Sequence, residues 1–120
     1  MVTSLGWVSM AAGTVLLLAS GDGVAAPAPD IHEVTLTLKD HRFTPEVVEA
    51  PAGRRIRINL VNRDAATEEF DSEDLHVEKD VTPNGKVSFV VGPLKPGAYS
   101  FMGELHPDTA SGTIRVGAAP

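Results

Sequence analysis

Residues 92–116 have the sequence Gly-Pro-Leu-Lys-Pro-Gly-Ala-Tyr-Ser-Phe-Met-Gly-Glu-Leu-His-Pro-Asp-Thr-Ala-Ser-Gly-Thr-Ile-Arg-Val, and their pattern is the strongest indication of the fold. The stretch begins with a turn rich in proline and glycine and continues as an alternating apolar run over 98–102. A polar loop that carries Glu104 and His106 leads into a second alternating run over 112–116. Alternation with a period of two predicts two strands joined by this loop. Because a loop between two strands of one sheet is fixed at both ends, its side chains can be aimed at a common ligand.

The rest of the chain repeats this pattern of short segments separated by turns that contain glycine or proline. The clearest of the predicted strands cover 34–38, 47–48, 54–62, 87–91, 98–102 and 112–116. The stretch 68–80 holds seven carboxylates and few apolar anchors, so we expect a loop there with one helical turn near 72–75, capped by Ser72. About seven to eight short strands without a long helix are typical of an all-β, Greek-key β-sandwich.

The composition suits one exported domain. The chain has 120 residues, 42% of them hydrophobic, and no cysteine, so one apolar core must hold the domain without disulfides. Residues 1–26 contain an apolar run followed by small residues, which predicts a secretory signal peptide. Residues 27–32 then form a linker and residues 33–117 the folded domain. A retained membrane anchor is the alternative for the N-terminus, but the apolar run is short for a bilayer crossing.

The charge balance limits the partners. Removal of residues 1–26 leaves 10 basic and 15 acidic residues. A net negative charge argues against nucleic acid as a partner. It suits cationic ligands such as metal ions.

Three groups of residues together resemble the cupredoxin superfamily. They are Phe43-x-Pro45 with Pro51-Ala52-Gly53, the Asn62-x-Asp64 turn that leads to Glu69-Phe70, and Tyr99-x-Phe101 with Glu104-x-His106 and Gly112. The resemblance covers residues 33–117. It is strongest to the cysteine-less cupredoxin-like domains of bacterial periplasmic iron-uptake proteins, which are associated with iron permeases. It implies a periplasmic β-sandwich with a metal site at one end.

The residues at the expected ligand positions exclude a blue-copper centre. Such a centre needs a cysteine thiolate, two imidazoles and a weak axial thioether. In the family pattern the cysteine stands three residues before the second histidine, where this chain has Gly103 ahead of His106. Glu68 stands at the first histidine position, and Ala110 and Ser111 stand where the axial methionine is expected. We therefore expect no blue-copper electron transfer.

The remaining polar side chains can still bind a metal ion. Met102, Glu104 and His106 have the spacing of side chains on one face of a strand, and Glu69 and Asp71 share that spacing. Such a set suits copper through His106 and Met102, or iron through the carboxylates. The resemblance separately implies Glu69, Asp71 and Met102. The candidate ligands are Glu69, Asp71, Met102, Glu104 and His106, with Glu68 and His76 as weaker candidates.

Each candidate has an ordinary structural alternative. Met102 can fill the core beside Phe101. His106 can be a loop histidine capped by Asp108. The acidic stretch can be a solvated face of the sheet. We expect His41 to be structural or on the surface.

Two functions from different classes follow. The first is a periplasmic accessory protein of iron or copper uptake that binds copper, iron or both and hands its ion to an inner-membrane iron permease. The second is a metal-free β-sandwich that docks a basic partner through its acidic face. Catalysis has little support, because the chain lacks the usual hydrolase, phosphate-loop and paired-histidine motifs. The one enzymatic possibility is oxidation of ferrous iron by copper held at His106 and Met102.

Overall fold

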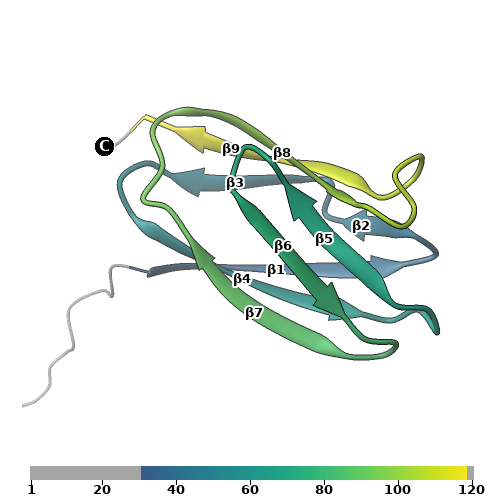
Figure 1. Ribbon diagram of the computed structural model, residues 1–120. Helices are drawn as coiled ribbons and strands as arrows, with labels where there is room; N and C mark the ends of the chain where they lie inside the picture. Colours follow the sequence, from purple (N-terminus) through teal and green to yellow (C-terminus); the bar gives the residue numbers. More distant parts are fainter. Residues whose placement is uncertain (1–30, 119–120) are drawn as a thin grey trace, which may run out of the picture.

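The computed structural model describes residues 31–118, which form nine β-strands in two sheets (Figure 1). The strands are β1 (Ile31–Lys39), β2 (Arg42–Thr44), β3 (Val47–Pro51), β4 (Arg55–Asn62), β5 (Glu68–Ser72), β6 (Val77–Val81), β7 (Lys86–Val91), β8 (Gly97–Gly103) and β9 (Ser111–Gly117). Within these residues there is no helix long and apolar enough to cross a membrane. The predicted signal peptide, residues 1–26, lies outside the described residues.

The strands divide between the sheets in a way that makes a sandwich. One sheet has the order β2-β1-β4-β7 and the other has the order β3-β9-β8-β5-β6. β1 pairs with β4 and β3 pairs with β9 in parallel, whereas the remaining pairs are antiparallel. The two layers are visible in Figure 1. The all-β sandwich predicted from the sequence is confirmed, with nine strands instead of seven to eight.

The core lies between the two sheets and follows the alternation in the sequence. In β4, Ile56, Ile58 and Leu60 are buried, and the residues between them are partly exposed. Four phenylalanines join the layers, Phe43 and Phe89 from the first sheet and Phe70 and Phe101 from the second. Burial of alternate apolar side chains on both inner faces provides most of the stability of such a fold.

The acidic stretch 68–80 is a β-hairpin, so the predicted loop with a helical turn was wrong. β5 and β6 pair from Glu68 opposite Val81 to Ser72 opposite Val77. Period-two alternation buries Phe70 and leaves the neighbouring carboxylates outside, which the high acidic content concealed. The predicted capping hydrogen bond of Ser72 is formed in the turn between β5 and β6, not at the start of a helix. Ser72 Oγ accepts a hydrogen bond from the backbone N–H of Leu75 at 3.1 Å.

The first strand begins earlier than expected. Ile31 and His32, which we interpreted as the end of the linker, are the first two residues of β1. They pair with Arg55 and Ile56 of β4. The added pairing extends the contact between the two central strands of the first sheet.

Candidate metal centre

Three segments that are distant in the sequence bring polar side chains together. His41 comes from the turn between β1 and β2, Glu68 is the first residue of β5, and His106 lies in the loop between β8 and β9. One nitrogen or oxygen atom from each residue lies within 4.8 Å of those of the other two. Two imidazoles and a carboxylate at this separation can share one metal ion.

Glu68 is the buried member of this group. Its side chain points inward because it occupies the same alternation as Phe70, and only 1% of the residue is exposed. Its Oε1 accepts the backbone N–H groups of Glu69 at 3.0 Å and Leu105 at 2.8 Å. Its Oε2 lies 2.6 Å from Nδ1 of His106. These contacts hold the carboxylate in one place and offset the cost of burying a charged group.

The imidazole of His41 covers that of His106. The two rings are stacked, with centroids 3.6 Å apart and planes inclined by 14°. Side-chain exposure is 42% for His41 and 32% for His106, so both rings lie between the core and solvent. Solvent can therefore reach both imidazoles.

The turn that carries His41 has an unusual backbone held by Asp64. Asp40 and His41 both have positive φ angles, 54° and 58°. The two carboxylate oxygens of Asp64 accept their N–H groups, at 2.7 Å from Asp40 and 2.9 Å from His41. Asn62 Oδ1 in turn accepts the N–H of Asp64 at 2.9 Å. Burial raises the pKa of Asp64, but the two backbone N–H groups outweigh burial and the pKa lies below its ordinary value.

The principal candidate ligands do not meet at one point. β8 ends at Gly103, so the strand geometry that would align Met102, Glu104 and His106 stops after Met102. Of these three residues, His106 contacts Glu68, whereas Glu104 lies with Glu69 and Glu78 on the other side of β5. Met102 is paired with Asp71 on β5 and lines a different part of the surface from the group that holds His106. The sequence favoured Glu69 over Glu68 because Glu69 shares a period of two with Asp71 and because the family resemblance implies Glu69, whereas the structure turns Glu68 inward.

Glu69, Glu78 and Glu104 form a second acidic group on the outer face. Their carboxylate oxygens lie within 4.8 Å of one another, and the residues are partly or fully exposed. Partial burial is the main cause that raises the pKa of Glu69 to about 7, followed by the hydrogen bond and charge of Glu104 and the neighbouring Glu78 and Asp80. The neighbouring carboxylates therefore add to the effect of burial and disfavour ionisation of Glu69.

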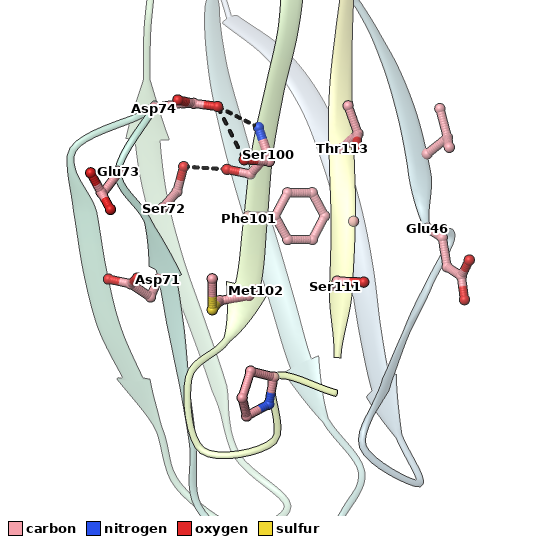
Figure 2. Close-up of a pocket in the computed structure, with 13 residues that line it drawn as sticks. Glu46, Asp71, Ser72, Glu73, Asp74, Ser100, Phe101, Met102, Ser111 and Thr113 are labelled. Atoms are coloured by element: carbon pink, nitrogen blue, oxygen red, sulfur yellow. Dashed lines mark hydrogen bonds between the residues drawn. The ribbon is translucent and has the colours of Figure 1, made fainter. Parts of the chain in front are cut away.

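Met102 and Asp71 line a separate surface groove of about 580 Å³. They are opposite each other in the β5 and β8 pairing, and Figure 2 shows both side chains beside the groove, with Glu46 on its far side. Met102 is 40% exposed, so it does not fill the core. His76 is exposed in the turn between β5 and β6 and belongs to neither group of candidate ligands in residues 31–118.

His41 was missed as a candidate ligand. Its local sequence, a polar break before Phe43, resembles that of any surface turn. The sequence feature that positions His41 is the Asn62-x-Asp64 turn. The hydrogen bond from the backbone N–H of His41 to Asp64 joins residues that are 23 positions apart in the sequence. A pattern search along the chain has no means of joining the two.

The fold and sequence agree in identifying the family. The family described as Cupredoxin-like domain matches residues 8–116. The chain belongs to the cupredoxin-like domain family. This cupredoxin-like protein is also 47% identical over 87 residues to "Uncharacterized protein RP394" of Rickettsia prowazekii (strain Madrid E), covering 72% of this chain and 70% of that protein.

Solved structures share the fold at low sequence identity. The metal-binding domain of the Streptococcus pneumoniae D39 Cu(I)-exporting P-type ATPase CopA matches with a TM-score of 0.66 and 13% identity, over 77% of this chain and 91% of that one. A copper-binding protein in its apo form matches with a TM-score of 0.62 and 15% identity, over 76% of this chain and 92% of that one. A purple cupredoxin from Nitrosopumilus maritimus matches with a TM-score of 0.54 and 15% identity, over 68% of this chain and 97% of that one. These similarities establish the fold of the cupredoxin-like protein.

Proposed function

We propose that this cupredoxin-like protein binds a divalent transition-metal ion, Cu(II) or Fe(II), through His41, Glu68 and His106. The observation that carries the proposal is the convergence of two imidazoles and one buried carboxylate within 4.8 Å at one end of the sandwich. Imidazole suits copper and iron, and two histidines with one carboxylate are a known set for non-haem Fe(II).

The donor set favours Cu(II) over Cu(I). Soft thiolate and thioether ligands select Cu(I). The chain has no cysteine, and Met102 lies in the outer groove away from Glu68 and His106. Nitrogen and oxygen donors therefore dominate the centre. A metal ion bound at Nδ1 of His106 would replace the hydrogen bond between that atom and Glu68 Oε2, which are 2.6 Å apart.

We further propose that the ion is cargo in metal uptake. In this proposal residues 1–26 direct export, and the periplasmic domain hands its ion to an inner-membrane iron permease. The resemblance of the sequence motifs to iron-permease-associated domains supports this role. The partial exposure of both imidazoles also supports it, because a partner's ligands can reach an ion there and exchange with them.

A metal-free interaction module is the second candidate. It is favoured by the hydrogen bonding of Glu68, whose two oxygens already have three partners without an ion. It is also favoured by the carboxylates on the outer face of the β5 and β6 hairpin, which are Glu69, Asp71, Glu78 and Asp80. In this case the acidic face docks a basic partner.

Isothermal titration of the purified protein with Cu(II), Zn(II) and, without oxygen, Fe(II) separates the two functions. The metal-binding function predicts one equivalent of bound ion. His41→Ala, Glu68→Gln and His106→Ala should each weaken binding by more than about 10-fold. His76→Ala is the matched control and should bind as the wild type does, since His76 lies outside the group. Absence of binding, or binding that none of the three substitutions weakens, would refute this metal centre.

A further inference from the structure

Gly103 has no room for a side chain while Glu68 is in place. Gly103 is the buried last residue of β8. A β-carbon added to it would lie 2.7 Å from Cδ and 2.9 Å from Oε2 of Glu68, and 2.8 Å from Cβ of Ala110. Carbon atoms prefer separations of about 3.5–4.0 Å, so these contacts require a neighbour to move. Ala110 and Glu68 are both buried, but the β-carbon of Ala110 is fixed to the backbone whereas the Glu68 side chain can rotate, so Glu68 is the neighbour that can move.

Movement of Glu68 would break its hydrogen bonds. Its carboxylate is held by the N–H groups of Glu69 and Leu105 and by Nδ1 of His106. A β-carbon at position 103 and the carboxylate at position 68 compete for one volume beside His106. The φ angle of Gly103 lies outside the positive region that favours glycine, so its backbone does not require glycine. The requirement for glycine therefore comes from the space that Glu68 and Ala110 occupy, and Glu68 supplies two of the three close contacts.

We propose that Gly103 is a positioning residue that admits the Glu68 carboxylate to His106 and thereby gives the centre its oxygen ligand. The inference rests on the proposed metal-binding function for its effect on metal affinity. Its effect on the contact between Glu68 and His106 can be measured without metal. Gly103 acts through Glu68 and has no ligand atom of its own to offer.

Gly103→Ala tests the proposal, with Gly117→Ala as the matched control. A β-carbon at Gly117 meets nothing within 4 Å, and its φ angle also lies outside the positive region. Gly103→Ala should weaken Zn(II) and Cu(II) binding by about 10- to 100-fold, the usual effect of disturbing a group that orients a metal ligand. In the metal-free protein, the NMR signals of the His106 ring nitrogens should shift because Nδ1 loses its carboxylate partner. Gly117→Ala should change neither quantity.

A double-mutant cycle identifies Glu68 as the residue that Gly103→Ala displaces. Gly103→Ala should cost less stability in a Glu68→Ala background than in the wild type, because the colliding carboxylate is then absent. Urea unfolding measures the four proteins of the cycle. An additive cycle would assign the cost to Ala110 and overturn the proposal. Unshifted His106 ring signals in Gly103→Ala would also overturn it.

The cycle and the ring signals also separate this inference from the metal-binding function. Suppose that the wild type binds no ion, but the cycle is non-additive and the ring signals shift. Gly103 then positions Glu68 as proposed, and the metal-binding function fails. If the wild type binds metal and Gly103→Ala binds it equally well, the role of Gly103 is refuted while the metal centre stands.

Discussion

Glu68 and Glu69 are adjacent in the chain and have opposite surroundings. Strand alternation buries Glu68 beside His106 and places Glu69 near Glu78 and Glu104 on the outer face. The first carboxylate is surrounded by hydrogen-bond donors, whereas the second is crowded by other carboxylates. Glu68 is therefore a candidate metal ligand, whereas the adjacent Glu69 is a carboxyl group that resists ionisation.

Glu69→Gln should remove a pH-dependent loss of stability. Because the pKa of Glu69 is raised from its ordinary 4.5 to about 7, the folded state binds its proton more tightly than the unfolded state does. The contribution of Glu69 to stability therefore falls as pH rises from about 4.5 to about 7. Urea unfolding across this range should show a smaller decline in Glu69→Gln than in the wild type.

Glu46→Gln, across the groove from the hairpin, is the control and should keep the wild-type decline. The same decline in Glu69→Gln as in the wild type would contradict the assignment to Glu69.

The turn between β1 and β2 shows how one element depends on another. Its backbone places His41 over His106, yet the acceptors that stabilise its two positive φ angles belong to Asp64, beyond the end of β4. Asn62 holds Asp64 in turn and also donates to the carbonyl groups of Ala66 and Thr82. The position of His41 is therefore set by β4 and the turn that follows it.

Asp64→Asn should destabilise this turn and weaken metal binding together. The amide keeps one oxygen acceptor, but its NH₂ group faces a backbone N–H and leaves that donor unsatisfied. Loss of the hydrogen bond should cost about 1–3 kcal/mol in the free energy of unfolding. Urea unfolding and Zn(II) titration measure the two effects. Asp108→Asn, in an exposed loop position, is the control, and wild-type stability in Asp64→Asn would contradict this account.

Aromatic packing between the two sheets supports the end of the sandwich that carries the candidate centre. Phe70 stacks on Phe101 with centroids 5.0 Å apart and contacts Phe43 and Phe89 of the opposite sheet at 6.1 and 5.0 Å. Phe70 is two residues from Glu68, and Phe101 is two residues from Gly103. The packing that holds the sheets together therefore also orients the backbone around the centre.

Phe70→Ala should cost about 3–5 kcal/mol in the free energy of unfolding, because it removes a fully buried ring and leaves a cavity. A domain of this size has roughly 5–15 kcal/mol of stability, so the variant should remain folded only marginally or unfold. Urea unfolding measures the difference. Leu105→Ala, at a residue that is 53% exposed, should change stability by less than about 0.5 kcal/mol. Equal effects of the two substitutions would contradict this description of the core.

The strands with clear alternation, and the apolar side chains that they bury, could be predicted from local sequence patterns. Ile56, Ile58 and Leu60 could be assigned to the core because a period of two is a local property of the chain. The same local reasoning placed His106 in the loop between the last two strands. It failed in the β5 and β6 hairpin, where charge concealed the alternation of Glu68, Phe70 and Ser72.

The contacts between side chains of the candidate centre depend on the packing of the whole domain. The contact between Glu68 and His106 spans 38 residues of sequence, and the His41 turn joins them from a third segment held by Asp64. These contacts depend on how the two sheets pack and on where β8 ends at Gly103. A shift of one residue in a strand turns a side chain to the other face, so local patterns could not distinguish Glu68 from Glu69.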